Sequence, residues 1–343
     1  MKKRFLLLVF IFSQLNSIYS QEKPEKCVGL FCSENTLDIQ LELYVDSLLA
    51  GGVSEKVKYP SILKFFSDNK IVDTFHIELS KRGHFRKFPN ICDFPPLRIH
   101  FDNQETSGTA FEGHNKVKIV THCQNNDSAF EQYVIQEYLI YKAYNLLTEK
   151  SFKTRLARIR YVDLSKTFPD VINYTFFIEN PNDLAARLNG SSLDVKYIYP
   201  QHLDQYQYAL MCLFQFMMIN QDWSVSLLHN VEIIATDPGF KMTPIPFDFD
   251  MCGIIAIPYK SPTVPFKKGV KPERNYMGKN ISKEHLLAAI DTLKANKNLI
   301  IKNFNTSPLL TPVNRKNIVN HLTEFYDNIS DFDYISKVML GGD

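Results

Sequence analysis

Apolar and polar residues alternate through most of the first third of the chain, a period of two that is typical of strands with one buried face. The longest alternation covers residues 37–45. Similar segments at 59–66, 72–79, 97–101 and 117–120 predict further strands. The first third is therefore predicted to be a mainly antiparallel sheet.

The hydrophobic period changes to that of a helix from Ser128 onward. Apolar residues recur every three or four positions between Phe130 and Tyr141, and Asp127 or Ser128 can cap the start of the helix. Glu137 falls inside this apolar face, where a carboxylate is costly to bury unless it is paired. The pattern predicts one helix that crosses the sheet and holds an acidic side chain on its buried side.

The second half of the chain is predicted to be richer in helix. The expected strands lie at 156–164, 174–179, 231–235 and 241–246, and the expected helices lie at 182–188, 205–219, 282–303 and 312–328. A sheet, one crossing helix and a helical second half indicate an α+β, two-lobed fold with a cleft between the lobes. We expect one domain at 36–340, with lobes at about 36–180 and about 181–340.

The first twenty residues predict export. Lys2, Lys3 and Arg4 precede a short apolar run, as in a secretory signal peptide at 1–20. No apolar run is long enough to cross a bilayer. We therefore expect a secreted or periplasmic mature chain without a transmembrane segment, starting with a poorly ordered lead-in at 21–35. Losing the leader turns the formal net charge of +2 slightly negative, which argues against nucleic acid as a partner.

The six cysteines suit an exported protein, because an oxidising environment favours disulfides. Their spacing contains no CxxC and no nearby pair of histidines, so it does not indicate a zinc site. Their positions allow the disulfides Cys27–Cys32 and Cys92–Cys123 and predict buried thiols at Cys212 and Cys252.

The densest group of candidate ligands lies in the stretch that begins at Asn220. Asp222 follows an apolar helix, Asn230 and Asp248 lie at the ends of strand-like segments, and Asp250 follows two residues later. Loop ends at strand tips commonly display binding groups. Mg²⁺ prefers such oxygen ligands, usually one or two carboxylates together with phosphates. The alternative for each residue is structural: a helix-end cap, a strand end or a solvated turn.

Basic residues elsewhere are candidates for contacts with a nucleotide. Lys116 and Lys118 share one face of a strand, where one can reach a phosphate and pair with Glu137; a solvated strand face is the alternative. Arg82 and Arg86 lie in a basic turn after a strand, for which a phosphate is a natural partner. A plain solvated turn is equally compatible with these two arginines.

Other enzyme classes find less support. The signatures GxGxxG, GxxxxGKS and GxSxG are absent, so the sequence does not support dinucleotide-binding, P-loop or serine-hydrolase sites. A glycosidase pair formed by Asp222 and Asp248 stays open, although it gives Asn230 no role. Glu179 ends an apolar strand, where the backbone can meet a nucleotide base; a simple strand end is the alternative.

Three groups of motifs resemble the CotH kinase family, the spore-coat-type, atypical protein-kinase-like proteins. They are the basic turn KRGHFRK, the strand TFFIEN with the following DLAARL, and the series NQDW, HN and PFDFD. Together they span about residues 37–253. The resemblance implies a kinase-like fold, ATP, a divalent metal and secreted or cell-surface protein targets.

The resemblance also implies roles for single residues. Asp222 would be the catalytic Asp, Asn230 and Asp248 would hold metal, and Asp250 would support them. The spacing from Asp222 to Asn230 is longer than in the usual kinase loop, and no lysine is an unmistakable counterpart of the family's nucleotide-binding Lys.

We therefore predict a secreted phosphotransferase that uses ATP with Mg²⁺ or Mn²⁺ and modifies an exported protein or another cell-envelope hydroxyl acceptor. The competing hypothesis is a catalytically inactive, kinase-like envelope-binding protein. The missing phosphate loop and the Pro- and Lys-rich segment 257–280 favour that alternative.

Overall fold

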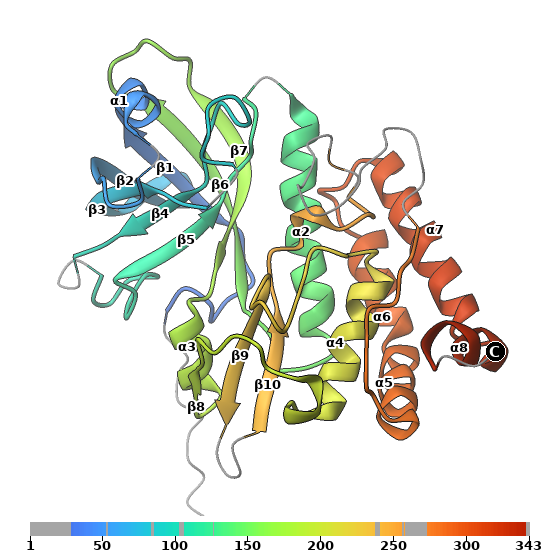
Figure 1. Cartoon of the computed structure of the whole chain (residues 1–343). Coiled ribbons are helices and arrows are strands. Elements are labelled where there is room, and N and C mark those ends of the chain that lie inside the picture. Colours follow the sequence, from blue (N-terminus) through green and yellow to red (C-terminus); the bar gives the residue numbers. More distant parts are fainter. Residues whose placement is uncertain are drawn as a thin grey trace, which may run out of the picture.

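The computed structural model describes residues 29–52, 54–83, 86–102, 106–125, 127–236, 241–255, 257 and 273–340. The first half of the described chain forms a closed barrel with the strand order β1-β2-β3-β4-β5-β7-β6 (Figure 1). Its strands are β1 (Leu37–Leu43), β2 (Tyr59–Ser67), β3 (Lys70–Lys81), β4 (Leu97–His100), β5 (Lys116–Val120), β6 (Thr154–Asp163) and β7 (Val171–Ile178). All of the strands predicted in this half are present.

The interior of the barrel is filled by the apolar positions of the alternating pattern. Buried members of this single cluster come from strands all around the barrel, among them Ile39 and Leu41 of β1, Phe75 of β3 and Ile119 of β5. Because successive side chains of a strand point to opposite faces, the polar residues between them lie outside.

Closure of the barrel corrects the predicted sheet. The described strand pairs are antiparallel except β1 and β6, which run parallel from the pair Leu37–Ala157 to the pair Leu43–Asp163. Alternation identifies the buried face of a strand but not its neighbour, so it did not reveal this contact. The predicted strand 37–45 also ends early, because helix α1 (Val45–Ala50) begins at Val45.

Helix α2 (Ser128–Asn145) lies between the barrel and the second half of the chain (Figure 1). Asp127 caps it by accepting a hydrogen bond from the backbone N–H of Ala129 at 2.9 Å. Tyr141 packs on Phe176 of the barrel's outer surface, with ring centroids 5.5 Å apart. A helix with apolar contacts on most sides is a buried helix, and α2 therefore joins the two halves.

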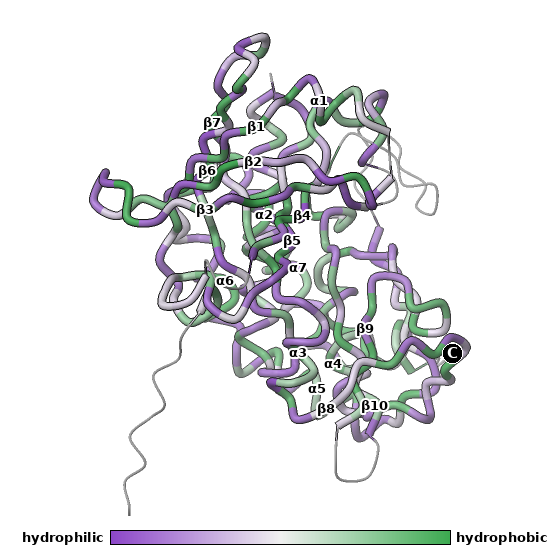
Figure 2. Tube along the Cα trace, turned by 90° about the vertical axis from the view of Figure 1, so that its left-hand side faces the viewer, coloured by the Kyte–Doolittle hydropathy of each residue, from purple (hydrophilic) through white to green (hydrophobic). Residues whose placement is uncertain are grey.

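The second half combines a three-stranded sheet, in the order β10-β9-β8, with helices packed behind it (Figure 2). The predicted helix 282–303 is wrong as a single element, because the helix is interrupted at Asn296. It forms two helices, α5 (Lys283–Ala295) and α6 (Lys297–Asn305). Helix α8 was not predicted. The elements are α3 (Pro181–Arg187), β8 (Gly190–Ser192), α4 (Gln205–Met217), β9 (Val231–Thr236), β10 (Lys241–Pro246), α5 (Lys283–Ala295), α6 (Lys297–Asn305), α7 (Pro312–Asn328) and α8 (Phe332–Met339).

The cysteine predictions are confirmed where the structure describes them. Cys92 and Cys123 form a disulfide, and Cys212 and Cys252 are free and buried. Cys27, the signal peptide and most of segment 257–280 lie outside the described residues. Within the described part of the chain, no helix is both long and apolar enough to cross a membrane.

We predict that acid destabilises the fold through His122, which is stacked on Phe94 with ring centroids 4.8 Å apart. Burial lowers the pKa of His122 from 6.5 to about 4. The unfolded chain thus takes up this proton first, and stability present above pH 6.5 is lost as the pH falls towards 4. This loss amounts to about 3 kcal/mol. Urea unfolding measures the difference in the free energy of unfolding between about pH 7 and about pH 4.5, two conditions that span most of this pH range.

The control is His122→Phe, which keeps an aromatic ring at the stack but cannot titrate. Its free energy of unfolding should depend less steeply on pH than that of the wild type over this window. Equal pH dependence in the two proteins would contradict the assignment to His122.

Candidate functional site

Asp222 is held at the end of α4 by its neighbour Asn220. The side-chain amide of Asn220 donates to Gln215 Oε1 at 2.9 Å, and its Oδ1 accepts the backbone N–H of Asp222 at 3.0 Å. The indole N–H of Trp223 donates to the Asn220 carbonyl at 3.2 Å. These bonds continue the helix end into a defined loop, so the position of Asp222 is determined by buried contacts rather than by an exposed turn.

A closed turn brings Asn230 back to Asp222 despite the long spacing between them. The backbone N–H of Ser224 donates to the carbonyl of His229, and that of His229 donates to the carbonyl of Ser224, both at 2.9 Å. Asn230 Nδ2 then donates to the Asp222 backbone carbonyl at 2.7 Å and to its carboxylate at 3.2 Å. The additional residues therefore form a separate turn and leave Asp222 and Asn230 in contact.

Asp248 enters the same region from the end of β10. The backbone N–H of Phe247 donates to the Asn230 carbonyl at 3.0 Å. The backbone N–H of Asp248 donates to the Tyr141 hydroxyl at 2.7 Å. Asp248 precedes the short 3₁₀ helix η2 (Phe249–Met251), and its side chain is exposed. Helix α2 thus positions the backbone that carries Asp248.

The acidic side chains converge on one buried thiol. Burial raises the pKa of Cys252 well above its usual range, and the charges of Glu137, Asp250, Asp222 and Asp248 add to this effect. All four carboxylates therefore lie within electrostatic reach of one point. The structure brings together the predicted acidic residues of α2, the α4–β9 loop and the β10–η2 turn.

Strained backbone is concentrated in the same place. Among the described residues, ten positions other than glycine have positive φ, and Ile219, Leu228, Asn230 and Asp248 are four of them. Such conformations cost about 1–3 kcal/mol each and persist where surrounding contacts hold them, commonly at functional sites. At Ile219 one such contact is the bond from the Gly253 N–H to the Ile219 carbonyl at 2.9 Å.

Glu137 lies buried beside this acidic group, as its place on the apolar helix face predicts. Burial raises the pKa of Glu137 well above its usual range, the Asp250 and Asp248 charges raise it further, and the Arg86 and Arg82 charges oppose the rise. Its Oε1 has no hydrogen-bond partner among the described residues. A buried polar atom left unpaired is uncommon and calls for a functional or local explanation.

Arg82 and Arg86 supply the positive charge on the barrel side. Arg82 Nη2 donates to the Ile119 carbonyl at 3.0 Å, and the Asp248 charge acts on this guanidinium. Arg86 Nη2 donates to the Thr121 carbonyl at 2.5 Å, and Nη1 lies 3.9 Å from Asp250 Oδ2. Both guanidinium groups are thus anchored on barrel carbonyls and face the acidic residues.

The two lysines of β5 lie in different surroundings. Burial lowers the pKa of Lys118, the Arg82 charge lowers it further, and the Asp248 and Glu232 charges oppose this. Lys116 is exposed and lines an open depression of the barrel surface with Lys58 and His100. Lys118 is therefore the lysine next to the acidic group, and the cations that act on Glu137 are arginines.

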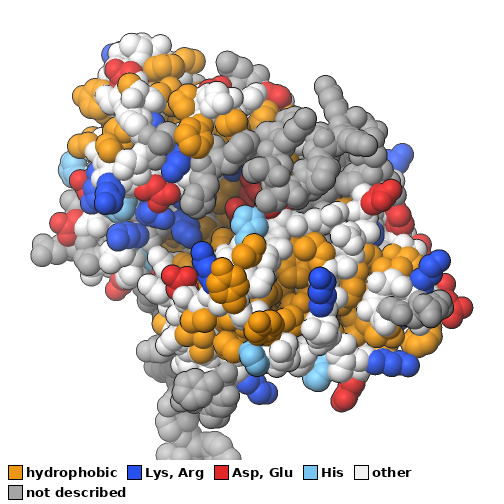
Figure 3. All heavy atoms as spheres, viewed as in Figure 1, with side chains coloured by type: hydrophobic (Ala, Val, Ile, Leu, Met, Phe, Trp, Pro, Cys, Tyr) orange, Lys and Arg blue, Asp and Glu red, His pale blue; other side chains and the backbone are white. Residues whose placement is uncertain are grey.

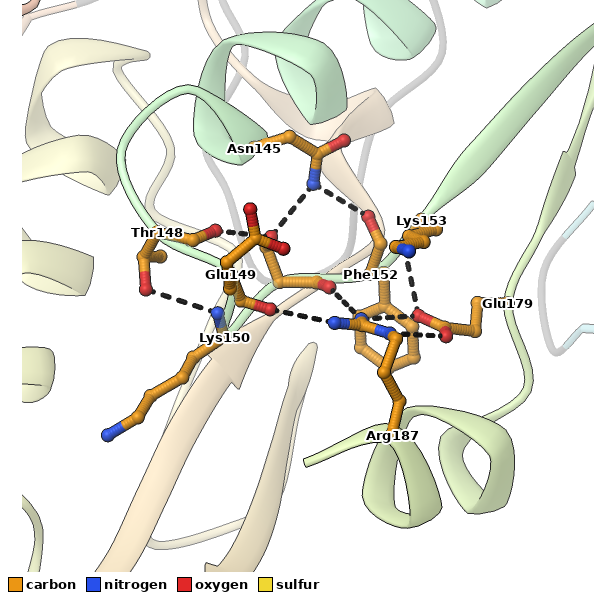
Figure 4. A network of polar contacts seen from close by, with 9 residues as sticks. Asn145, Thr148, Glu149, Lys150, Phe152, Lys153, Glu179 and Arg187 are labelled. Carbon is orange, nitrogen blue, oxygen red and sulfur yellow. Dashed lines mark hydrogen bonds and ion pairs between the residues drawn. The ribbon is translucent and has the colours of Figure 1, made fainter. Parts of the chain in front are cut away.

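Glu179 belongs to a polar network between the two halves of the molecule (Figure 4). Its two carboxylate oxygens accept from Arg187 Nε at 2.9 Å and Nη2 at 2.8 Å, and the backbone N–H of Lys153 donates to Oε2 at 3.0 Å. Arg187 Nη2 also donates to the Ser151 carbonyl at 2.7 Å. The Glu179 side chain is therefore saturated by protein contacts at the junction of β6, β7 and α3.

The donor set is suited to a hard divalent cation that also binds phosphate. In the described part of the chain, no three His, Cys, Asp or Glu side chains lie close enough to hold a metal by themselves. Asn230 adds an amide oxygen, and Asp248 exposes its carboxylate. A Mg²⁺ site of one or two carboxylates that is completed by phosphates and water has this composition.

Sequence reasoning missed three contributors to the site. Tyr141 was assigned only to an apolar helix face, Glu232 was not singled out, and His229 was part of the HN motif without a role of its own. Glu232 of β9 accepts a hydrogen bond from the Ser192 hydroxyl, and the Lys118 charge acts on its carboxyl group. His229 Nε2 lies 3.1 Å from Asp222 Oδ1. The available signal was that one charged residue, Glu232, interrupts the apolar strand β9 two residues after Asn230.

The surface view shows where charged and hydrophobic side chains gather on one face of the molecule (Figure 3). Figure 3 shows Lys and Arg side chains gathered over the barrel strands and hydrophobic side chains spread over the helical half below them. At the acidic group itself, the charges of Arg82 and Arg86 act on Glu137, and the charge of Asp248 acts on Lys118. Basic and acidic side chains this close together attract a polyanion that carries a cation, because each charge finds an opposite partner.

Comparisons with known proteins add one distant structural similarity. No family model matches the chain, and no curated protein matches it. Among solved structures, the chain is similar to the crystal structure of a Helicobacter pylori proinflammatory kinase, CtkA, at 12% sequence identity and a TM-score of 0.39, over 74% of this chain and 96% of that one. A score this low transfers no residue or activity.

We predict that Glu179 stabilises the protein. Glu179→Ala leaves the Arg187 guanidinium without its carboxylate, and breaking a mostly buried ion pair costs about 3 kcal/mol. The Glu179 and Arg187 side chains are 5% and 22% exposed. Urea unfolding measures the change. Lys153→Ala is the matched control, because the hydrogen bonds between Lys153 and Glu179 involve only the backbone of Lys153; equal stability of the two variants would contradict the prediction.

Proposed function

We propose that this protein is an exported phosphotransferase that moves the terminal phosphate of ATP to a hydroxyl group of an exported protein or another cell-envelope acceptor. The proposal draws on one arrangement of neighbouring side chains. Asp222 and Asn230 are hydrogen-bonded to each other, Phe247 bonds to Asn230 directly before Asp248, and the Asp248 charge acts on Arg82 and Lys118. Phosphoryl transfer requires this combination of acid, amide and cation.

Asn230 and Asp248 are the residues that would hold Mg²⁺ or Mn²⁺, with Asp250 beside them. The bound metal would neutralise charge on the phosphates. The protein also has cations of its own for this purpose: Arg82 and Arg86 are held by barrel carbonyls at the acidic group. Guanidinium groups bind phosphate oxygens well, so the two side chains can take part in orienting a polyphosphate.

Lys118 and Glu232 extend this arrangement toward the outer part of the gap. Lys118 lies on β5 and Glu232 on β9, and each charge acts on the other. A polyphosphate in the gap offers Lys118 a stronger anionic partner than a partly buried carboxyl group does. Lys118 is therefore the lysine that we assign to the nucleotide phosphates, and Lys116 lies too far along the exposed strand face to share that role directly.

Asp222 is the group placed to receive the proton of the acceptor. The acceptor oxygen forms a bond to the terminal phosphorus as its O–H bond breaks, and the proton moves to the Asp222 carboxylate. The bond from that phosphorus to the bridging oxygen breaks, and ADP leaves with the electron pair. A positioned carboxylate that accepts a substrate proton is the usual role of the catalytic Asp in kinases.

We predict that Asp222→Asn strongly slows transfer but leaves nucleotide binding intact. The amide keeps the shape of the side chain but is no base, so kcat should fall at least about 100-fold. Transfer and hydrolysis are measured with γ-labelled ATP and Mn²⁺ on a cell-envelope extract. The control is Asp291→Asn, an exposed position on α5.

Nucleotide-dependent thermal shifts separate this proposal from the inactive, envelope-binding alternative. ATP with Mn²⁺ should raise the melting temperature of the wild type and of Asp222→Asn, because a ligand that binds only the folded state stabilises it by mass action. A shift without transfer or hydrolysis would favour the alternative, and a flat response would remove ATP from the proposal.

We predict further that Mn²⁺ quenches the fluorescence of Trp223, the single tryptophan of the chain. Trp223 is buried directly after Asp222, so a paramagnetic ion at Asn230 and Asp248 would lie near its ring. Quenching should saturate with added Mn²⁺ and weaken at least about tenfold in apparent affinity for Asp248→Asn, which loses a charged oxygen ligand. Unchanged quenching in that variant would place the metal elsewhere.

A further inference from the structure

The turn between Ser224 and His229 does more than bridge the long spacing from Asp222 to Asn230. Its ends are joined by the two backbone bonds between Ser224 and His229, both 2.9 Å long. The backbone N–H of Leu227 also donates to the Ser224 hydroxyl at 3.3 Å. A turn closed in this way holds its last residue in a defined place, and that residue is His229.

The His229 ring lies against the Asp222 carboxylate. Its Nε2 is 3.1 Å from Asp222 Oδ1, and the two side chains are 47% and 9% exposed. Asn230 Nδ2 donates to the other oxygen, Oδ2, at 3.2 Å. The two neighbouring residues thus each contact a different oxygen of one nearly buried carboxylate.

Contacts on both oxygens matter because the terminal torsion of an aspartate side chain has no sharply preferred angle of its own. Rotation of the carboxylate group is governed by a broad, two-fold potential, so hydrogen bonds must set its direction. Each ionised oxygen can accept more than one bond. A donor on each oxygen therefore fixes the plane of the group and still leaves acceptor sites for an incoming hydroxyl.

We infer that His229 is a positioning residue, which orients the Asp222 carboxylate through the Nε2 hydrogen bond so that the carboxylate meets the acceptor hydroxyl in line for transfer. The inference rests on the proposed function and adds to it a residue that a shorter loop could not supply. A neutral N–H donor is sufficient for this role. The backbone of the turn, rather than the imidazole ring, maintains the local fold.

The test compares His229→Leu, which removes the donor, with His229→Gln, whose side-chain amide nitrogen is the same number of bonds from Cα as Nε2. We expect kcat to fall about 10- to 100-fold in His229→Leu, as for a catalytic group displaced by about 1 Å. The KM for ATP should change less than about twofold, because the ring does not contact the phosphate-binding side chains. His229→Gln should recover most of the lost kcat.

A second comparison asks whether His229 acts through Asp222. In an Asp222→Asn background, His229→Leu should reduce the residual rate by less than about twofold, because effects of residues that act as a unit do not add. Leu227→Ala, at an exposed position in the same turn, is the control for general disturbance and should retain the wild-type rate. Wild-type kcat in His229→Leu, no recovery in His229→Gln, or full additivity would overturn the inference.

A crystal structure of His229→Leu gives a readout that does not depend on activity. A rotated or multiply oriented Asp222 carboxylate supports the inference, and a carboxylate in its original plane overturns it. Absence of transfer in the wild type would count against the proposed function alone, since the structure of the variant would still decide the role of His229.

Discussion

Several carboxylates lie close together in this protein, and their mutual repulsion is the constraint around which the site is built. The charges of Asp250 and Asp248 both raise the pKa of Glu137, on top of the effect of its burial. Like charges in a poorly solvated place oppose one another unless cations lie among them. Arg82 and Arg86 supply part of the positive charge that reduces this repulsion, and a divalent cation bound with a phosphate chain would supply the rest.

Holding such charges in place requires bonds between elements that are distant in sequence. The Tyr141 hydroxyl connects α2 to Asp248 at 2.7 Å, and Gly253 connects η2 to the end of α4 through Ile219. Arg86 connects the barrel to the same group through Asp250. The positive-φ residues are tolerated because these bonds restrain them, and the site is shared by the barrel, α2 and the helical half.

The parts of this arrangement that were predictable from the sequence are local in origin. Alternation and helical period depend only on neighbouring residues, so the strands of the barrel and helix α2 were found nearly at their true positions. The series Asp222, Asn230 and Asp248 was recognisable because Asp222 and Asp248 follow apolar elements and Asn230 directly precedes one. Barrel closure, the break at Asn296 and the side of α2 that meets Asp248 depend on contacts between distant segments.

Two glutamates show why the remaining contacts were not predictable. Glu137 and Glu179 look alike in sequence, since each lies beside apolar residues at a regular element. In the fold, Glu179 accepts three hydrogen bonds from Arg187 and Lys153, whereas Glu137 Oε1 accepts none from the described residues. A saturated carboxylate stabilises the structure, and an unsaturated one beside other acids is available for chemistry. The two outcomes differ because the fold brings hydrogen-bond donors of Arg187 and Lys153 to Glu179 and leaves Glu137 Oε1 without one among the described residues.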